Sequence, residues 1–475
     1  MTHAKLLFCA LLLAFSSQKI AAQVADSTVI EVTAIGIQPG KVSLVGTWGD
    51  QNYIADTTVA DANGHFVLRR QKTLPPGFYY FLMQGQKNFS FLIDKEQFIK
   101  MKFDVADITK TLEVEGSLNT ELFYKNQRFQ SGQELELNQL AAKMKAAPEG
   151  SEEYKKAKAR QDQMLAERKA HLQEIYKAHP NSLFTKFKIA GQNPDAVDFR
   201  KPNGDLDTLR QLIDYRARFW DGVDFADDRL LRTPVIANKL RRYMKELTPQ
   251  NPDSLIKVGD ALVRRVLPHK QYFKFIANWI GLTYENGKTN VMDGEAVYVH
   301  IVKNYFTPEL AFWATEKEIK DLQKHVSEME ASLLGRKGPD VRAMDISGQM
   351  KSIYEMTAPL IVVFMYSPDC DHCKKESPEI RRLYEKWKTK GVDFYAIAVN
   401  TTESEWRAFH QKQGFTFTNV FDPTNRAIYA KYFVDITPEL YLLNKDRTIV
   451  AKNLHSNQLE EVFERELKKI GMWPP

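Results

Sequence analysis

Two cysteines separated by two residues, Cys370 and Cys373, are the feature that most restricts how this chain can fold. The spacing suits either a disulfide across the first turn of a helix or half of a zinc site, so the flanking residues must decide. Residues 359–364 form a short apolar run, which is typical of a strand buried on both faces. The pattern predicts a buried strand that leads into a helix with the two thiols at its start. The helix is indicated by apolar side chains at helical spacing, in Ile380, Leu383, Tyr384 and Trp387.

A proline and a distant second motif extend this pattern. Pro378 follows the second cysteine within the predicted helix, and Thr437-Pro438 stands just before the apolar run of residues 440–443. The combination resembles the thioredoxin superfamily, in which a cis-proline lies beside the dithiol. The closer resemblance is to the TlpA/ResA-like, redoxin-related branch, and it covers roughly the last third of the chain. Its marks are Gly338-Pro339-Asp340, Asp345-Ile346-Ser347-Gly348, the Cys-x-x-Cys-Lys-Lys-Glu run, and Phe421-Asp422-Pro423.

The first 22 residues have the pattern of a cleavable signal peptide. Lys5 gives a positive start, residues 6–15 are apolar, and residues 20–22 form a small-residue cleavage end. The apolar run is too short to span a bilayer, and no later segment is long and apolar enough for a membrane span. Cys9 lies inside the apolar run rather than after it, which argues against a lipid anchor. The sequence therefore predicts export to the periplasm, with the Cys-x-x-Cys pair as the only cysteines of the mature chain.

At 475 residues the chain is too long for a single core, and its patterns divide it into three domains after residues 1–22. Residues 23–116 contain short, alternating segments rich in β-branched and aromatic residues, which predict an all-β sandwich or barrel. Residues 117–334 are rich in helix formers and lack a repeat, which predicts an all-α domain. Residues 335–475 alternate between strand and helix patterns. The predicted fold class is thus a multidomain chain that ends in an α/β, thioredoxin-like domain.

Several other functions are excluded by the charge pattern and by the residues around the motif. The net charge of +6 is spread over many Lys and Glu residues, so no nucleic-acid surface is predicted. A second Cys-x-x-Cys or a His pair is missing, and Lys374 stands where a c-type haem site needs a histidine. We therefore expect no metal and no cofactor. The peroxiredoxin pattern needs a proline where this chain has Val363, although Ser367 matches its hydroxyl position, so a peroxidase is set aside.

The helix start assigns different roles to the two thiols. A free cysteine has a pKa of ~8.5 and is mostly protonated at neutral pH. The free N–H groups and the dipole of a helix N-terminus favour the thiolate, so Cys370 is predicted to be the attacking thiol. Cys373 lies one turn further into the helix and is predicted to resolve the mixed disulfide. His372 can add a positive charge near the thiolate and the substrate, whereas Asp371 opposes that charge; both residues equally fit a solvated loop end.

The resemblance implies roles for three more residues. Glu376 matches the acid that follows the second cysteine in the ResA-like pattern, where it tunes the thiols; an exposed acid favoured by the helix dipole is an equally good interpretation. Thioredoxins also carry a buried acid in the strand before the motif, but this chain has Phe364 at that position. Pro438, in the cis form, turns the backbone of Thr437 toward a bound substrate segment.

The predicted function is disulfide exchange with envelope proteins, with this chain as the reductant. Its partners are then protein disulfide substrates and an upstream redox partner in the envelope. The rival hypothesis is a binding scaffold, in which the residues before 335 bind a partner and the thioredoxin fold is secondary. The intact cysteine pair favours the oxidoreductase. The sequence leaves the direction of electron flow, the clients, the reducing partner and the oligomeric state open.

Overall fold

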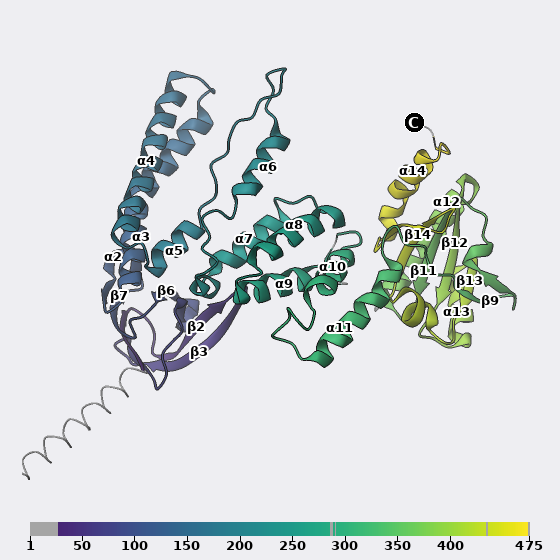
Figure 1. Ribbon diagram of the computed structural model, residues 1–475, viewed down its shortest axis with the longest axis horizontal. Coiled ribbons are helices and arrows are strands. Elements are labelled where there is room, and N and C mark those ends of the chain that lie inside the picture. Colours follow the sequence, from purple (N-terminus) through teal and green to yellow (C-terminus); the bar gives the residue numbers. More distant parts are fainter. Residues whose placement is uncertain (1–26, 286–287, 290, 434–435, 474–475) are drawn as a thin grey trace, which may run out of the picture. The chain divides into compact units, whose positions relative to one another are not determined.

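The computed structural model describes residues 27–473 except 286–287, 290 and 434–435 (Figure 1). The chain forms two compact units, residues 1–243 and residues 244–475. The division falls near the end of helix α7 (Pro234–Lys245), inside the region that the sequence assigns to one helical domain. The later helices therefore belong to the same unit as the α/β domain, and independent folding of residues 335–475 stays a prediction. The predicted signal peptide lies outside the described residues.

The first unit begins with two four-stranded sheets that share one core, which confirms the predicted all-β sandwich. The sheet orders are β4-β1-β7-β8 and β3-β2-β5-β6. Alternating apolar side chains of both sheets, such as Ile30, Phe81 and Met101, are buried between them. The strands are β1 (Thr28–Ile35), β2 (Gly40–Trp48), β3 (Gln51–Ala60), β4 (His65–Arg70), β5 (Gly77–Leu82), β6 (Asn88–Ile93), β7 (Phe98–Asp104) and β8 (Glu113–Glu115).

The helices of the first unit start with a long hairpin, α3 (Leu118–Ala146) and α4 (Glu152–Ala178), which run side by side (Figure 1). Ser117 and Ser151 cap these two helices, because each side chain accepts a hydrogen bond from a backbone N–H of the first turn. Three more segments precede α7: α5 (Leu183–Ala190), α6 (Thr208–Arg218) and the 3-10 turn η2 (Asp228–Arg232).

The second unit begins with four helices that confirm the predicted helical character. They are α8 (Pro252–Val266), α9 (Lys270–Tyr284), α10 (Glu295–Tyr305) and α11 (Glu316–Met329). Asn251 caps α8 with Pro252 in its first turn, and Thr315 and Glu318 form a capping box at α11. These starts agree with the proline and capping signals of the sequence.

A seven-stranded sheet with helices on its faces forms the rest of the second unit, as the α/β prediction requires. The sheet order is β10-β9-β13-β12-β11-β14-β15. Strand β11 is parallel to β12 and antiparallel to β14, and all seven of its residues are buried. The elements are β9 (Arg342–Asp345), β10 (Met350–Ser352), β11 (Leu360–Tyr366), α12 (Asp371–Trp387), β12 (Val392–Ala398), α13 (Glu403–Gln413), β13 (Thr418–Phe421), the π-helix η6 (Ala427–Tyr432), β14 (Glu439–Asn444), β15 (Ile449–Lys452) and α14 (Leu459–Lys469).

A buried lysine joins this sheet to helix α10. The ammonium of Lys452, on β15, donates to the carboxylate of Glu295 and lies 3.7 Å from Oδ1 of Asp293. All three side chains are almost fully buried. Glu439, on the adjacent strand β14, is buried near the same charges, and its Oε1 has no hydrogen-bond partner among the described residues. We call these four residues the charge cluster; it places more carboxylates than cations in an environment of low dielectric constant.

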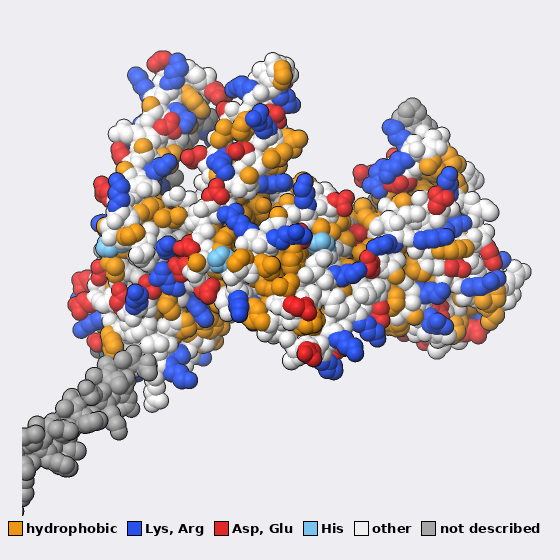
Figure 2. Space-filling view, in the orientation of Figure 1, with side chains coloured by type: hydrophobic (Ala, Val, Ile, Leu, Met, Phe, Trp, Pro, Cys, Tyr) orange, Lys and Arg blue, Asp and Glu red, His pale blue; other side chains and the backbone are white. Residues whose placement is uncertain are grey.

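Opposite charges are interspersed over the described surface. In Figure 2 the Lys and Arg side chains alternate with Asp and Glu side chains on the visible face, without a large region of one sign. Within the described ranges, no helix has both the length and the apolar character needed to cross a membrane.

We expect the free energy of unfolding of the second unit to fall as the pH rises from about 4 to about 8. Burial raises the pKa of Asp293 to about 6 and that of Glu439 to about 8. Unfolded Asp and Glu titrate near ~3.9 and ~4.3, so the folded state holds more protons within this range. Stability that is present below the unfolded pKa values is therefore lost as the pH rises through the folded values, by at most roughly 1.4 kcal/mol per pKa unit. Denaturant unfolding at a series of pH values measures this slope.

Glu439→Gln should flatten the upper part of this slope, because the amide has no proton to release. The matched control is Glu464→Gln, which changes an exposed glutamate of α14 and should keep the slope of the unmodified chain. An identical slope in the Glu439→Gln variant would contradict the titration of this carboxyl group.

Candidate active site

Cys370 lies where the central strand passes into helix α12. Strand β11 ends at Tyr366, and a turn follows in which the Cys370 N–H donates to the carbonyl of Ser367 at 3.1 Å. Cys370 is the N-cap residue of α12, and its Sγ accepts a hydrogen bond from the backbone N–H of Cys373 at 3.3 Å. A sulfur at this position faces the unpaired N–H groups of the first turn, which favour a negative charge. The predicted position of the dithiol at the helix start is confirmed.

The two thiols differ sharply in their surroundings. Both are free, with Cys370 half-buried and Cys373 completely buried. Burial raises the pKa of Cys373 to about 12, and the neighbouring sulfur of Cys370 adds to the effect. Cys373 is therefore protonated at neutral pH and shielded from solvent. This arrangement is the one that an attacking thiol followed by a resolving thiol requires.

The loop before strand β14 completes the site. The Thr437–Pro438 peptide bond is cis, and the thiol of Cys370 donates a hydrogen bond to the carbonyl oxygen of Thr437 at 3.1 Å. The antiparallel pairing of β14 with β11 brings this loop to the end of the central strand, where the dithiol lies. The expectation of a cis-proline beside Cys370 is confirmed, and the substrate role of Thr437 stays a prediction.

Glu376 and His372 occupy different environments on the same helix. Glu376 is half-buried, and its Oε2 accepts a hydrogen bond from the backbone N–H of Ser456 at 3.0 Å. Its Oε1 lies 3.8 Å from Nδ1 of His455. Glu376 thus joins α12 to the segment before α14, which is a structural role that the sequence did not indicate. His372 is exposed in the first turn, where a client can reach it. The influence of both residues on the thiols stays a prediction.

Two buried polar groups near the site escaped the sequence analysis. Glu439 directly follows the cis-proline, and in the sheet it is opposite Met365 on β11. The hydroxyl of Tyr366, at the end of β11, exchanges hydrogen bonds with the side chain of Asn419 at 3.0–3.1 Å, and the Trp406 indole donates to the same amide oxygen at 3.0 Å. An acid at the start of an otherwise apolar strand was a sequence signal that could have pointed to Glu439. The hydrogen bonds of Tyr366 carried no such signal, because they depend on the order of the strands in the sheet.

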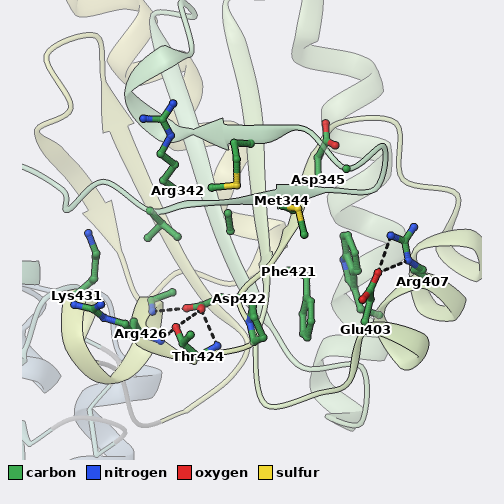
Figure 3. A pocket seen from close by; sticks show the side chains of 17 residues that line it. Arg342, Met344, Asp345, Glu403, Arg407, Phe421, Asp422, Thr424, Arg426 and Lys431 are labelled. Carbon is green, nitrogen blue, oxygen red and sulfur yellow. Dashed lines mark hydrogen bonds and ion pairs between the residues drawn. The ribbon is translucent and has the colours of Figure 1, made fainter.

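A cavity of about 620 Å³ lies at the edge of the same sheet, but neither cysteine lines it. Figure 3 shows Phe421 between Arg407, which pairs with Glu403, and Asp422, which accepts hydrogen bonds from Thr424. Arg407, Glu403 and Asp422 already have partners within the fold, and the cavity is not lined by either thiol, so we assign it no part in the thiol chemistry. Among the residues that the structure describes, no group of three or more His, Cys, Asp or Glu side chains is placed to hold a metal ion.

Comparison with known families agrees with this geometry. The model of the AhpC/TSA family matches residues 334–452. The C-terminal domain is thioredoxin-like. A second model, a domain of unknown function (DUF4369), matches residues 28–123, which include the β-sandwich.

Curated relatives of the thioredoxin-like domain are named thiol-disulfide oxidoreductase ResA. The protein of Bacillus thuringiensis is 26% identical over 148 residues, which are 31% of this chain and 84% of that protein. The protein of Geobacillus kaustophilus is 25% identical over 144 residues, which are 30% of this chain and 82% of that protein.

Solved structures include a thioredoxin-like protein from Bacteroides caccae with a TM-score of 0.46 and 19% identity, which covers 57% of this chain and 98% of that chain. A domain of a possible thiol-disulfide isomerase from Cytophaga hutchinsonii has a TM-score of 0.28 and 28% identity, and it covers 29% of this chain and 96% of that chain.

Iodoacetamide should alkylate Cys370 well before Cys373 in the native thioredoxin-like domain. Cys370 is partly exposed at a helix start, whereas Cys373 is fully buried and its pKa is raised to about 12. Single-thiol variants separate the two rates: Cys373→Ser should be labelled quickly, and Cys370→Ser only after denaturation. Mass spectrometry of the intact chain counts the labels, and equal labelling rates in the two variants would contradict the assignment.

Proposed function

We propose that this chain is an exported thiol-disulfide oxidoreductase that reduces disulfides of envelope proteins through Cys370 and Cys373. The observation that carries the proposal is the contrast between a half-exposed thiol at the N-cap of α12 and a buried thiol one turn further on. The relatives named thiol-disulfide oxidoreductases support the same chemistry. The export part rests on the signal-like pattern of residues 1–22, and N-terminal sequencing of the exported protein should find a start near Gln23.

Exchange starts with Cys370. Its thiolate attacks one sulfur of the client disulfide, a new S–S bond forms, and the client's other sulfur leaves as a thiolate that takes up a proton. Cys373 then loses its proton and attacks the Cys370 sulfur, which breaks the mixed disulfide and releases the second client sulfur. The client has gained two electrons and two protons, and the Cys370–Cys373 pair has become a disulfide. An upstream redox partner in the envelope must return those electrons.

The buried thiol supports the reducing direction. A dithiol becomes a strong oxidant when its reduced form is stabilised as a thiolate. Burial removes this contribution at Cys373, because it raises the pKa of this thiol to about 12 and disfavours its anion, so that Cys370 is the thiol whose anion would make the pair oxidising. Ionisation of Cys373 is then coupled to the second step, in which the departing client sulfur is an available proton acceptor.

The remaining site residues serve recognition and tuning in this proposal. The backbone of Thr437, held by the cis bond to Pro438, lies beside the attacking sulfur and pairs with the extended client segment. His372 contributes a positive charge near the client when it is protonated. Glu376 acts on the thiols through its place on the first turns of α12 and its bond to Ser456.

Cys373→Ser should accumulate covalent client complexes that dithiothreitol releases. In this variant Cys370 can still attack, but nothing can resolve the mixed disulfide. Cys370→Ser should trap no client, because the remaining thiol is buried. Non-reducing electrophoresis of envelope extracts measures the trapped species. If neither variant traps a client and the double serine variant keeps the in vivo phenotype, the binding-scaffold hypothesis replaces the oxidoreductase.

The reduction potential of the Cys370–Cys373 pair should lie below roughly −200 mV, in the range of reducing thioredoxins. The reason is that the buried Cys373 gains no stabilisation as a thiolate. Equilibration with glutathione or dithiothreitol redox buffers, followed by alkylation of the free thiols, gives the potential. A value above roughly −150 mV would make the protein an oxidant and reverse the proposed direction.

A further inference from the structure

A second cavity, remote in sequence from the cysteines, lies among the helices of the first unit. Its volume is about 410 Å³. Helix α4 contributes Leu172, α5 contributes Phe187 and Lys188, and α7 contributes Val235 and Lys239. Most of the side chains that line it come from these three helices, and the segment after α5 and Phe219 after α6 supply the rest. A cavity of this size is within the range that takes a small organic ligand.

Lys239 is the most unusual residue of this cavity, which we call the cationic cavity. Its side chain is 5% exposed. Its Nζ donates one hydrogen bond, to the carbonyl of Gln192 at 3.0 Å, and lies 4.1 Å from the centre of the Phe219 ring. An ammonium group has three N–H donors, and no carboxylate pairs with this one within the described residues. Burial, together with the smaller effect of the Arg242 charge, lowers the pKa of Lys239 to about 8.

Two more cations line the same cavity. Lys188 is half-buried, and among the described residues its ammonium makes no hydrogen bond or ion pair. Burial lowers its pKa as well. The guanidinium of Arg242 lies 5.9 Å from the Phe219 ring centre. No Asp or Glu is found among the described residues that line the cavity. Lys239 is the one of these three cations that is almost fully buried, and an uncompensated charge in an apolar environment is costly.

The rest of the wall is apolar. Leu172, Phe187, Phe219 and Val235 face the same space as the cations. An inorganic anion would satisfy the charges but leave this apolar surface without contacts. A carboxylate attached to an aromatic or branched aliphatic group matches both the cationic and the apolar part of the wall.

We propose that the cationic cavity binds a small organic carboxylate, whose anionic group pairs with Lys239 and whose apolar body packs against Phe219 and the neighbouring aliphatic side chains. The site is independent of the dithiol and does not depend on the proposed redox function. A bound carboxylate supplies the counter-charge that the cavity lacks, so binding stabilises the protonated form of Lys239.

Isothermal titration calorimetry with the full mature chain and 3-phenylpropanoate tests the proposal. We expect saturable binding near neutral pH, with proton uptake at about pH 8 that appears as a dependence of the measured heat on the buffer's ionisation enthalpy. 3-Phenylpropan-1-ol has the same apolar body without the charge and should bind at least about tenfold more weakly. Equal binding of the alcohol, or no detectable binding of 3-phenylpropanoate up to millimolar concentration, overturns the proposal.

Variants assign the binding to this cavity. Lys239→Met should weaken 3-phenylpropanoate binding by at least about tenfold, because it removes a charged hydrogen-bond donor, and Lys188→Met should weaken it by a smaller factor, because it removes a positive charge from the wall of the cavity. Lys188→Met keeps the test valid if Lys239→Met does not fold, which circular dichroism shows. The matched control is Lys177→Met, which changes an exposed lysine of α4 and should leave the affinity unchanged. Unchanged affinity in the folded variants overturns the proposal, as does inorganic phosphate that binds as tightly as the organic acid.

Discussion

The complete burial of strand β11 is the constraint on which the thioredoxin-like domain depends. Its seven residues pair with β12 on one side and with β14 on the other, so the strand cannot shift without breaking two ladders. One end of this strand delivers Cys370 to the start of α12, and the adjacent strand begins at the cis-proline. Two segments that are far apart in the sequence thereby meet at one sulfur atom. The geometry of the thiol site is a consequence of how the central strand is buried.

Local patterns predicted most of the elements, because their periodicity reflects burial. The alternation in β1 and the helical spacing of apolar residues in α12 predicted the type of these elements. Strand β3 lies at the edge of its sheet and is mostly exposed, so its polar residues carry no alternation to read. The strands β9 and β10 were also not recognised in the sequence, because three or four residues are too few to show an alternation.

Some residues of the candidate site could be predicted from local sequence patterns, and others could not. Spacing predicted the position of Cys370 and Cys373 at a helix start, and the family resemblance predicted the cis bond at Pro438. Glu439 stood out as an acid at the start of an apolar strand, but its place near the buried Lys452 could not be predicted, because it depends on contacts between β14, β15 and a helix more than a hundred residues earlier. The two units also treat a buried lysine in opposite ways. Lys452 is surrounded by carboxylates, whereas Lys239 has only a carbonyl and an aromatic ring. The first arrangement compensates the charge within the fold, and the second has the uncompensated charge that the proposed carboxylate would neutralise.

The hydrogen bond from the Cys370 thiol to the carbonyl of Thr437 has a consequence for the timing of client recognition. A thiolate has no proton to donate, and neither does a sulfur in a mixed disulfide. Activation of Cys370 therefore releases the Thr437 carbonyl as an acceptor at the moment when a client segment arrives with its own backbone N–H groups. We expect the protonated Cys370 thiol to occupy the Thr437 carbonyl in the resting dithiol. The carbonyl then becomes available to a client backbone N–H only when Cys370 is a thiolate and ready to react.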